Sequence, residues 1–460
     1  MVELDGAPRP MTSVDPANFD PPAGFRRVVE TLEEAGFEAW AVGGALRDAW
    51  AGEVATGAVP RRSDWDVATR ARPADVMRLF RRTVPIGVEH GTVGVLDEDG
   101  STYEVTTFRR DIETDGRHAV VTFADHIQED LARRDFTINA MAWRPRTDER
   151  CDPFHGLEDL RQGVLRAVGD AKDRFQEDYL RVLRGLRFAG RFHLEVEQGT
   201  AEALEAAVGG LSRLSAERVR EELMKVLRDP APSTALDLYA AFGALEHWFP
   251  EIDEAGRDRV AWRRHLATVD AIRPHRPLVR LARLLLVAGG EPAEAHASAA
   301  ALLQRLKSST ADRRRVAALL EGYLPFVSPM DSSAALRSWL AEVGDVWRDL
   351  FRLHVGGARA ARDDHRSRYL AAAWRALHST VLEHPTLTLA GLEISGEDLL
   401  ELGVMPGPIV GMLLEELLAQ VLEDPERNGR EVLIAEAARL IEIGSLAGHG
   451  SASGTGGPDA

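Results

Sequence analysis

The feature that most constrains the fold is a change of hydrophobic pattern near residue 150. Before it, short apolar runs such as FEAWAV (37–42) and YEVTT (103–107) alternate with turn residues and short helical segments. After it, nearly every segment has the three- and four-residue apolar spacing of an amphipathic helix, as in IVGMLLEELLAQVL (409–422). This pattern predicts an α+β domain with a mixed sheet, followed by an all-helical remainder.

Length and charge limit the class of protein. The 460 residues correspond to roughly two to four domains. The chain carries 56 Lys+Arg against 73 Asp+Glu, a net charge of −17, which argues against coating nucleic acid by bulk charge but allows a locally positive cleft. No apolar stretch approaches the roughly 18–20 residues of a membrane-spanning helix, and the N-terminus lacks a signal-peptide pattern. Cys151 is the single cysteine, which excludes an intramolecular disulfide framework. We predict a cytoplasmic protein.

A glycine pair marks the first candidate site. Gly43 and Gly44 lie where a predicted strand turns into a helix, and Arg47 follows one turn later. Glycine lets a backbone approach a phosphate closely, and arginine binds phosphate oxygens. A glycine pair that ends a strand is also an ordinary turn, so these residues do not establish a phosphate site by themselves.

Two aspartates mark the second candidate site. Asp64 and Asp66 flank Trp65 on the next predicted strand, and side chains alternate along a strand, so both carboxylates point to the same side of the sheet. Paired carboxylates on a rigid strand suit Mg²⁺, which can activate a hydroxyl and neutralise a triphosphate. A solvated turn is the alternative for an isolated Asp-x-Asp motif.

The order of the motifs identifies a family. The sequence resembles the class II tRNA nucleotidyltransferases, which comprise the CCA-adding enzymes and bacterial poly(A) polymerases, mainly over residues 25–225. The motifs that carry the resemblance are VGGALRD (42–48), SDWDVAT (63–69), HGTVGV (90–95), YEVTTFRRD (103–111), EDLARRDFTINAMAW (129–143), DPFHGLEDL (152–160) and EDYLRVLRGLRFAGRF (177–192).

The resemblance implies specific roles for some of these residues. Asp64 and Asp66 match the carboxylates that hold two Mg²⁺ ions in the family, and Gly44 and Arg47 match its phosphate contacts. Arg134 matches a nucleotide-contacting arginine. We expect its neighbour Arg133 to be structural, since adjacent side chains on a strand or helix start cannot face one site. We assign no chemistry to Asp135 or Asn139, and Glu104 is a weaker candidate for a third acidic group.

The predicted helix from about Arg174 carries a row of arginines. Its members Arg181, Arg184, Arg187 and Arg191 recur at three- and four-residue spacing, and the interleaved Leu180, Leu183, Leu186 and Phe188 should face the core. Few acidic residues lie four positions away, so we expect a triphosphate or RNA phosphate to neutralise the row; a solvated charged face is the alternative.

The resemblance also implies how the base is selected. Glu177, Asp178 and Arg181 match the family's Glu-Asp-x-x-Arg template, in which Asp and Arg bond to the edge of the incoming base. A carboxylate accepts from the amine that cytosine and adenine share, whereas uracil and guanine present a carbonyl there. Residues 109–122 resemble the flexible loop that lets the pocket pass from C to A, although Ala119 replaces a common proline.

The helical remainder carries weaker resemblances. Residues 262–310 resemble an HD-type phosphohydrolase domain without its His-Asp pair, which leaves His265 and His296 as the candidate ligands and predicts a structural domain. The turn at 403–408 resembles the tail module of related enzymes. The predicted domains are 1–22 (disordered), 23–150 (polymerase-β-like nucleotidyltransferase head), 151–228 (neck), 229–380 (body), 381–446 (tRNA-binding tail) and 447–460 (disordered).

We therefore predict template-independent addition of CMP and AMP from CTP and ATP to the tRNA 3′ end, with Mg²⁺ as cofactor and release of pyrophosphate. The expected partners are the tRNA 3′ end and acceptor arm, without a membrane or an obligate protein partner. Arg134, Arg184 and Arg187 would contact phosphate or ribose. The alternatives are a CC-adding or A-adding specialist, a poly(A) polymerase, which the acidic C-terminal helices disfavour, and an inert RNA-binding protein on the same scaffold.

Overall fold

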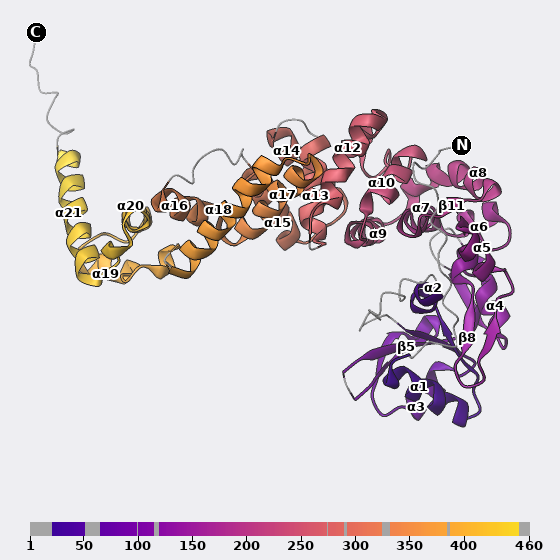
Figure 1. Ribbon diagram of the computed structural model, residues 1–460. Coiled ribbons are helices and arrows are strands. Elements are labelled where there is room, and N and C mark those ends of the chain that lie inside the picture. The colour runs from indigo at the N-terminus through magenta and orange to yellow at the C-terminus, as the bar shows by residue number, and fades with distance from the viewer. Residues whose placement is uncertain are drawn as a thin grey trace, which may run out of the picture. The chain divides into compact units, whose positions relative to one another are not determined.

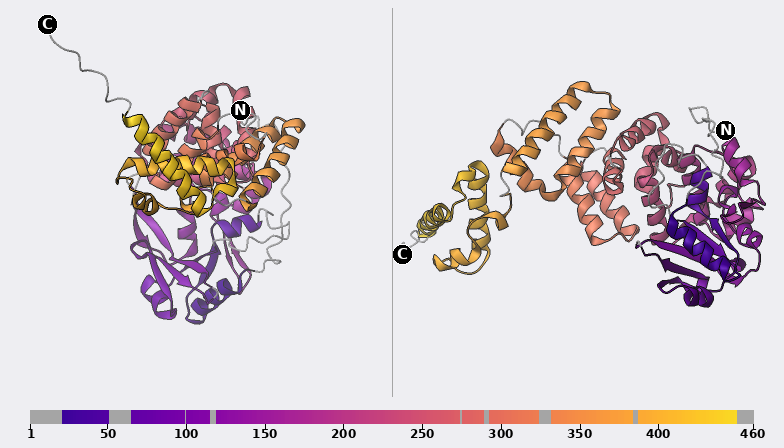
Figure 2. Two further views of the ribbon diagram at one scale, coloured as in Figure 1. Left: turned by 90° about the vertical axis from the view of Figure 1, so that its left-hand side faces the viewer. Right: turned by 60° about the horizontal axis from the view of Figure 1, so that its bottom comes forward.

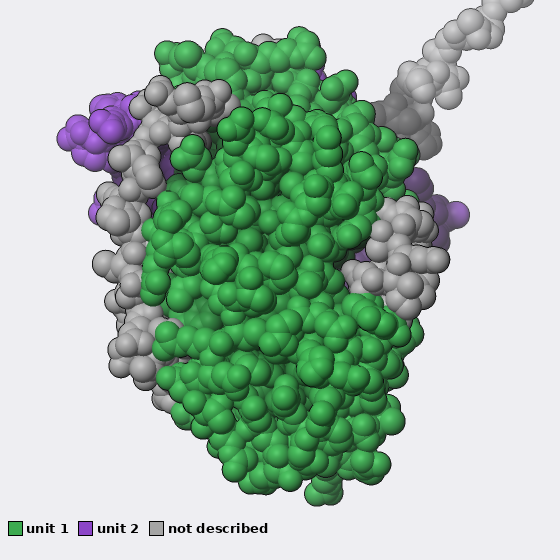
Figure 3. All heavy atoms as spheres, turned by 90° about the vertical axis from the view of Figure 1, so that its right-hand side faces the viewer, with its two compact units in different colours: residues 1–270, 300–309 green, residues 271–299, 310–460 purple. Residues whose placement is uncertain are grey.

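The computed structural model describes residues 21–50, 65–98, 100–114, 119–273, 275–288, 292–323, 332–383 and 387–449. The chain divides into two compact units. The first comprises residues 1–270 with 300–309 and is green in Figure 3, and the second comprises residues 271–299 with 310–460 and is purple.

A seven-stranded mixed sheet forms the N-terminal part of the first unit, and its strand order is β3-β4-β5-β2-β1-β8-β9. Neighbouring strands are antiparallel except β2 and β5, which are parallel. The predicted α+β class is thereby confirmed. The strands are β1 (Ala39–Val42), β2 (Asp66–Thr69), β3 (Thr83–Gly87), β4 (Thr92–Leu96), β5 (Thr102–Thr107), β8 (Ala142–Arg144) and β9 (Glu149–Cys151).

Helices α1 (Ala23–Glu34) and α3 (Pro73–Leu79) pack beside the sheet, as Figures 1 and 2 show in indigo and violet. Phe25 of α1 contacts Trp65 and Tyr103, with ring centroids 4.9 and 6.1 Å away. Because side chains alternate along a strand, the residues that follow these two, Asp66 and Glu104, point to the opposite face.

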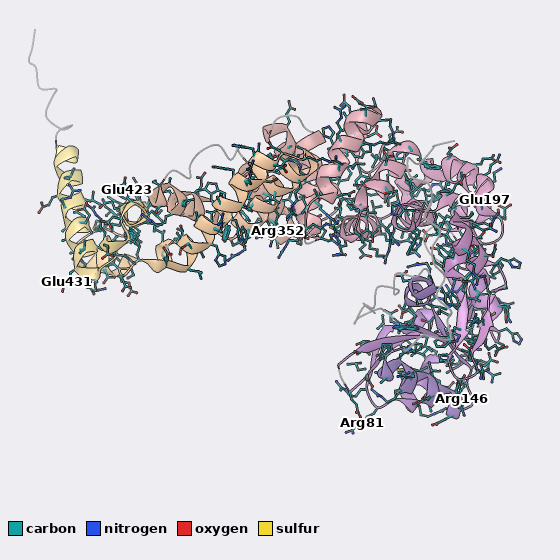
Figure 4. The ribbon with its side chains drawn as sticks, viewed as in Figure 1. Arg81, Arg146, Glu197, Arg352, Glu423 and Glu431 are labelled. Atoms are coloured by element: carbon teal, nitrogen blue, oxygen red, sulfur yellow. The ribbon has the colours of Figure 1, made fainter. Side chains whose placement is uncertain are left out.

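That opposite face carries its own apolar cluster. Trp40 and Ala68 from the sheet pack there with Phe108 and with Leu131 of α4 (Ile127–Ala132). Charged side chains such as Arg81 and Arg146 are exposed and point outward in Figure 4.

The predicted flexible loop at 109–122 is largely a β-hairpin. Strands β6 (Arg109–Thr114) and β7 (Ala119–Phe123) pair antiparallel, with a register irregularity between Asp111 and Glu113. Asp115, Gly116 and Arg117, which carry part of the resemblance to the family's loop, lie outside the described residues. The expectation of little regular structure is wrong for the two arms, where β-branched residues support a strand.

Helices form the rest of the first unit, with α7 at the centre. Its Leu180, Leu183, Leu186 and Phe188 are buried, as predicted. A Cβ on Gly190 would lie 2.4 Å from the Ala235 nitrogen, so glycine permits the close packing of α7 against α10. The elements are α2 (Gly44–Trp50), α5 (Gly156–Gln162), β10 (Val164–Leu165), α6 (Ala171–Glu177), α7 (Leu180–Phe192), β11 (Glu195–Val196), α8 (Gln198–Ala207), α9 (Ala216–Arg228), α10 (Pro232–Ala241), α11 (Pro250–Arg257) and α12 (Arg259–Asp270).

The expectation of one continuous helix from about Arg174 is wrong. Asp178 has extended backbone angles (φ −157°, ψ 106°), which separate α6 from α7. Its side-chain Oδ1 accepts a hydrogen bond from the Leu180 amide at 3.0 Å. Aspartate competes for backbone amides at helix starts, which explains why α7 begins here.

The second unit is built from helices with two apolar clusters, one around Trp347 and Leu377 and one around Leu399 and Leu417. Arg337 donates to the carbonyls of Leu422 at 2.6 Å and Glu423 at 2.7 Å, and Glu423 is labelled in Figure 4. None of the described helices is both long and apolar enough to cross a membrane. The helices are α13 (Pro277–Ala288), α14 (Pro292–Arg305, shared with the first unit), α15 (Thr310–Glu321), α16 (Ser333–Val343), α17 (Trp347–Ala360), α18 (Asp364–Glu383), α19 (Gly396–Glu401), α20 (Pro408–Glu423) and α21 (Arg430–His449).

Candidate functional site

The glycine pair forms the predicted turn between β1 and α2. Gly43 has φ +84°, and a Cβ added there would lie 2.5 Å from the Asp66 Oδ2 atom. Gly44 has no positive φ, and the atom nearest to a Cβ added there is Arg47 Nη2, at 3.5 Å. Gly43 is therefore required by the turn and by the adjacent carboxylate, whereas the fold alone does not require glycine at position 44.

Two carboxylates, Asp66 and Glu104, lie on the face of the sheet opposite α1 and α3. Asp66 is the first residue of β2, and the parallel register pairs Val67 with Val105 of β5. Stepping back one residue on both strands places Glu104 beside Asp66 on the same face. Asp64, the other predicted metal ligand, lies outside the described residues.

This donor set suits a hard cation, because Mg²⁺ prefers carboxylate oxygens on rigid elements. No three His, Cys, Asp or Glu side chains gather as a metal site within the part of the chain that the structure describes. The assignment of two Mg²⁺ ions to Asp64 and Asp66 stays a prediction.

Arg47 points from α2 toward the neck. Its guanidinium is buried, with Nη1 donating to the Asn139 Oδ1 atom at 2.7 Å and Nε donating to Asp48 at 2.8 Å. The guanidinium carbon lies 4.8 and 4.6 Å from the ring centroids of Phe188 and Phe192 on α7. Burial lowers the pKa of Arg47, and Asp48 opposes that shift. Arg47 therefore connects the glycine turn to α7 by direct contact.

Arg134 and Arg133 share one carboxylate. Arg133 Nη2 lies 2.8 Å from Asp130 Oδ1, and Arg134 Nη2 lies 3.2 Å from Asp130 Oδ2. Both adjacent arginines can reach Asp130 because α4 ends at Ala132 and both residues lie beyond its end. The structural role of Arg133 and the nucleotide contact of Arg134 stay predictions. Arg134 Nη1 also donates to the Asn139 carbonyl at 3.1 Å, and the side chain of the same asparagine accepts from Arg47.

Asp178 and Arg181, which match the family's base template, lie near the start of α7. Arg181 donates through Nη1 to Glu177 and to the Arg174 carbonyl at 2.9 Å, and through Nη2 to the Arg133 carbonyl at 3.2 Å. Asp178 Oδ2 accepts from Arg218 Nη2 at 2.6 Å. Both side chains are thus held in fixed orientations by protein groups.

Protein carboxylates neutralise the rest of the arginine row. Their sources are spread over the chain: Arg184 Nη2 lies 2.6 Å from Asp135 Oδ2, Arg187 Nε lies 2.8 Å from Glu222 Oε2, and Arg191 Nη2 lies 3.0 Å from Asp48 Oδ2. The inference that the row needs a bound anion for lack of acidic partners is therefore wrong. The partners come from distant segments, which helical spacing does not reveal.

These pairs keep the carboxylates ionised. Burial would raise the pKa of Asp135, but Arg184 and the Asn139 amide stabilise its charged form, so its pKa lies below the usual range. Burial likewise opposes the ionised form of Glu222, and Arg187 together with Lys225 outweighs it, so this pKa is also lowered. In return, Asp135 raises the pKa of Arg184.

Sequence reasoning missed this set of partners. Asp135 received no role, and Asp48, Asp130, Arg218 and Glu222 were not considered. One signal was available: Arg218 and Glu222 are four residues apart in SAERVREELMKVL (215–227), which places them on one face of a helix. That spacing alone does not say which helix the face contacts.

The histidines proposed for the HD-like region lie in different units. His265 belongs to α12 of the first unit and His296 to α14 of the second. His296 Nδ1 lies 3.3 Å from Glu321 Oε1. The resemblance of this region to an HD domain stays a prediction.

Two protein families match parts of the chain between residues 39 and 255. A family described as the Poly A polymerase head domain matches residues 39–166. A second, described as a probable RNA and SrmB-binding site of polymerase A, matches residues 193–255. A CCA-adding enzyme of Levilactobacillus brevis is 33% identical over 418 residues, which cover 89% of this chain and 96% of that enzyme. The CCA-adding enzyme of Limosilactobacillus fermentum is 31% identical and covers 93% and 98% of the two chains.

Solved structures show the same similarity. The Bacillus stearothermophilus CCA-adding enzyme in complex with CTP aligns with a TM-score of 0.73 at 28% identity, over 93% of this chain and all of that chain. A tRNA nucleotidyltransferase complexed with a primer tRNA and an incoming ATP analog aligns with a TM-score of 0.57, over 77% of this chain and 99% of that chain. At 22% identity, the second match shows a shared fold.

Proposed function

The chain belongs to the class II family of CCA-adding tRNA nucleotidyltransferases, and from this premise we propose how its own residues bind the substrates and select the base. One observation carries the assignment. Arg47 follows the glycine turn beside Asp66 and packs against Phe188 and Phe192 of α7, the helix that begins next to Asp178. These contacts support the proposal that Asp66 and the base-reading residues near the start of α7 act in one site.

Asp64 and Asp66 would hold two Mg²⁺ ions, with Glu104 beside Asp66 as a third carboxylate. The bound metal would help to deprotonate the tRNA 3′ hydroxyl and neutralise charge on the triphosphate. Asp66 is held in place by the Gly43 turn, which leaves no room for a side chain above its Oδ2 atom. The protein's contribution is mainly positioning, as expected for nucleotidyl transfer.

Gly44, Arg47, Arg134, Arg184 and Arg187 would bind the phosphates and ribose of the nucleotide. Arg184 is the more accessible of the two α7 residues, with 31% of its side chain exposed against 6% for Arg187. Arg47 and Arg187 must exchange a protein partner before they contact a phosphate directly. We propose that they first set the positions of α2 and α7, and that Arg184 and Arg134 meet the nucleotide from the surface.

Asp178 and Arg181 would read the base. The Asp178 carboxylate accepts a hydrogen bond from the exocyclic amine of cytosine or adenine, and Arg181 donates to a ring nitrogen or carbonyl. Uracil and guanine place a carbonyl opposite the carboxylate, which leaves two acceptors facing each other. The same two side chains therefore admit both CTP and ATP.

The tRNA 3′ end and acceptor arm are the proposed RNA partner, and the cytoplasm is the proposed location. The family includes poly(A) polymerases, yet the relatives that match nearly the whole chain are CCA-adding enzymes. Residues 387–449 contain many more acidic than basic residues, which disfavours a polymerase that grips RNA through a basic tail.

Incorporation of labelled CTP and ATP with Mg²⁺ into tRNA transcripts tests the proposal. The transcripts end at the discriminator base, at C or at CC, and each nucleotide is supplied alone and together. We expect completion to CCA from every start. Stopping at CC, or extending only the CC transcript, would identify a specialist; long A tails would identify a polymerase, and no incorporation would favour the inert scaffold.

A further inference from the structure

Helix α9 presents two opposite charges to the base-reading region. Arg218 and Glu222 lie one turn apart on α9, and α9 packs against α7 (Figure 1). Arg218 Nη2 donates to Asp178 Oδ2 at 2.6 Å, and Glu222 Oε2 accepts from Arg187 Nε at 2.8 Å. One helix face therefore contacts both the proposed base-reading carboxylate and an arginine of the row.

The contact with Arg218 completes the fixation of Asp178. One carboxylate oxygen accepts from the Leu180 amide at 3.0 Å, and the other accepts from Arg218. Two donors on different oxygens prevent the carboxylate from rotating about its own bond. A quarter of the Asp178 side chain remains exposed, and an ionised carboxylate has about four acceptor positions, so an incoming amine still finds a free one.

Resting on the proposed function, we propose that Arg218 is a specificity-determining positioning residue. It holds the Asp178 carboxylate so that its free acceptor positions face the incoming base at a fixed angle. The exocyclic amine of cytosine or adenine donates to this carboxylate. The carbonyl of uracil or guanine instead faces an acceptor that cannot rotate to avoid it.

Loss of Arg218 would relax this selection. The carboxylate would keep the Leu180 amide but could rotate around it, and a water molecule could then bridge it to a carbonyl of uracil or guanine. Cytosine and adenine would lose a preorganised acceptor at the same time. The expected signature is a fall in discrimination rather than a uniform loss of activity.

The test compares Arg218→Met with Arg220→Met. Arg220 lies on the same helix but donates to the Leu306 carbonyl at 3.2 Å, so it is a matched control for loss of an arginine from α9. The measurement is kcat/KM for CTP and UTP on a tRNA ending at the discriminator base, and for ATP and GTP on one ending at CC. We expect Arg218→Met to lower both ratios by about 10- to 100-fold, the range of a charge-assisted hydrogen bond. The KM for tRNA should stay unchanged.

The outcomes separate this inference from the proposed function. Unchanged ratios in Arg218→Met, or an equal fall in Arg220→Met, overturn the inference while wild-type CCA addition stands. No incorporation by the wild-type protein overturns the proposed function itself, and the inference with it. If Arg218→Met does not fold, Arg218→Lys decides: its single ammonium should give intermediate ratios, and wild-type ratios would overturn the role of the guanidinium.

Discussion

Helices α7 and α20 both combine apolar and charged residues, but their charged residues have different surroundings. Three arginines within α7 pair with carboxylates from other segments, such as Asp135 and Glu222. Helix α20 contains no arginine or lysine, and its Glu415 and Glu416 are exposed. Amphipathic spacing therefore identifies both as helices, and the contacted partners distinguish the paired arginines of α7 from the exposed carboxylates of α20.

Two buried arginines show the same difference. Arg187 in the first unit pairs with the buried carboxylate of Glu222, while Arg337 in the second donates to the backbone carbonyls of Leu422 and Glu423. A cation at the end of a helix satisfies carbonyls that lack an intrahelical partner. Burial alone thus does not mark an arginine as part of a substrate site.

The largest effect on nucleotide incorporation is expected at Asp66, on the face of the sheet opposite α1 and α3. Asp66→Asn should lower nucleotide incorporation by about a thousandfold, because a neutral amide holds a divalent cation poorly. Thermal unfolding should change little, which calorimetry can check. Glu416→Gln on α20 is the matched carboxylate control and should incorporate both nucleotides at the wild-type rate. Substantial turnover by Asp66→Asn would contradict the metal assignment.

Removing each buried arginine sharpens the comparison between the units. Arg187→Met removes one of two cations that lie 2.8 Å from Glu222, and Lys225 remains as the other. It should cost about 3 kcal/mol of unfolding free energy, the lower end for a broken buried pair, together with most of the incorporation. Arg337→Met should destabilise the second unit by about 1–3 kcal/mol, since the buried Leu422 carbonyl and the partly buried Glu423 carbonyl lose a charged donor. Incorporation into an acceptor-arm minihelix should survive in Arg337→Met; urea titration and a minihelix assay measure the two effects.

The pH dependence of stability should report on the paired carboxylates of the first unit. The pKa values of Asp135 and Glu222 are lowered in the folded protein, so their stabilisation is present above the ordinary values of 3.8 and 4.5 and is lost as the pH falls below them. Glu222→Gln should therefore make Tm fall less steeply between pH 7 and pH 3 than in the wild type. Each kcal/mol of pH-dependent stability that the variant lacks corresponds to about 2–4 °C in Tm. Calorimetry between pH 7 and pH 3 tests this, and parallel curves for variant and wild type would contradict it.

The smallest effect is expected in the tail. Met405 is 77% exposed, just before the turn into α20. Met405→Ser should change the free energy of unfolding by no more than about 0.5 kcal/mol and leave minihelix incorporation unchanged. Its effect on full-length tRNA, measured as KM, reports on the proposed tRNA contact of the tail; a loss of minihelix activity would place Met405 in the catalytic region instead.

The local pattern was sufficient to predict the main elements of the head. Alternation around Trp65 and Tyr103 and the glycine pair gave the strands and the strand-turn-helix unit, because these depend on neighbouring residues. The break at Asp178 was missed, since one side-chain bond to the Leu180 amide decides it. The hairpin at 109–122 was missed because its charged residues obscure a strand pattern.

The candidate site was predictable in its members but not in its contacts. Family resemblance supplied the proposed roles of Asp66, Asp178 and the arginines, and these roles stay predictions. The carboxylates that pair with the arginines were not predicted, because Asp48 and Glu222 are far from their partners in sequence. Such pairings depend on tertiary packing, which one sequence does not encode in its spacing.

The glycine turn has a consequence for how the gene can vary. At position 43, the left-handed backbone and the nearby Asp66 oxygen make any side chain strained, so selection for folding alone would favour glycine there. At position 44, an added methyl group would meet only ordinary contact distances. A population of variants selected first for expression and then for growth would therefore separate the two positions. Substitutions of Gly43 would disappear at the first selection. Substitutions of Gly44 would disappear only at the second, when a nucleotide has to bind.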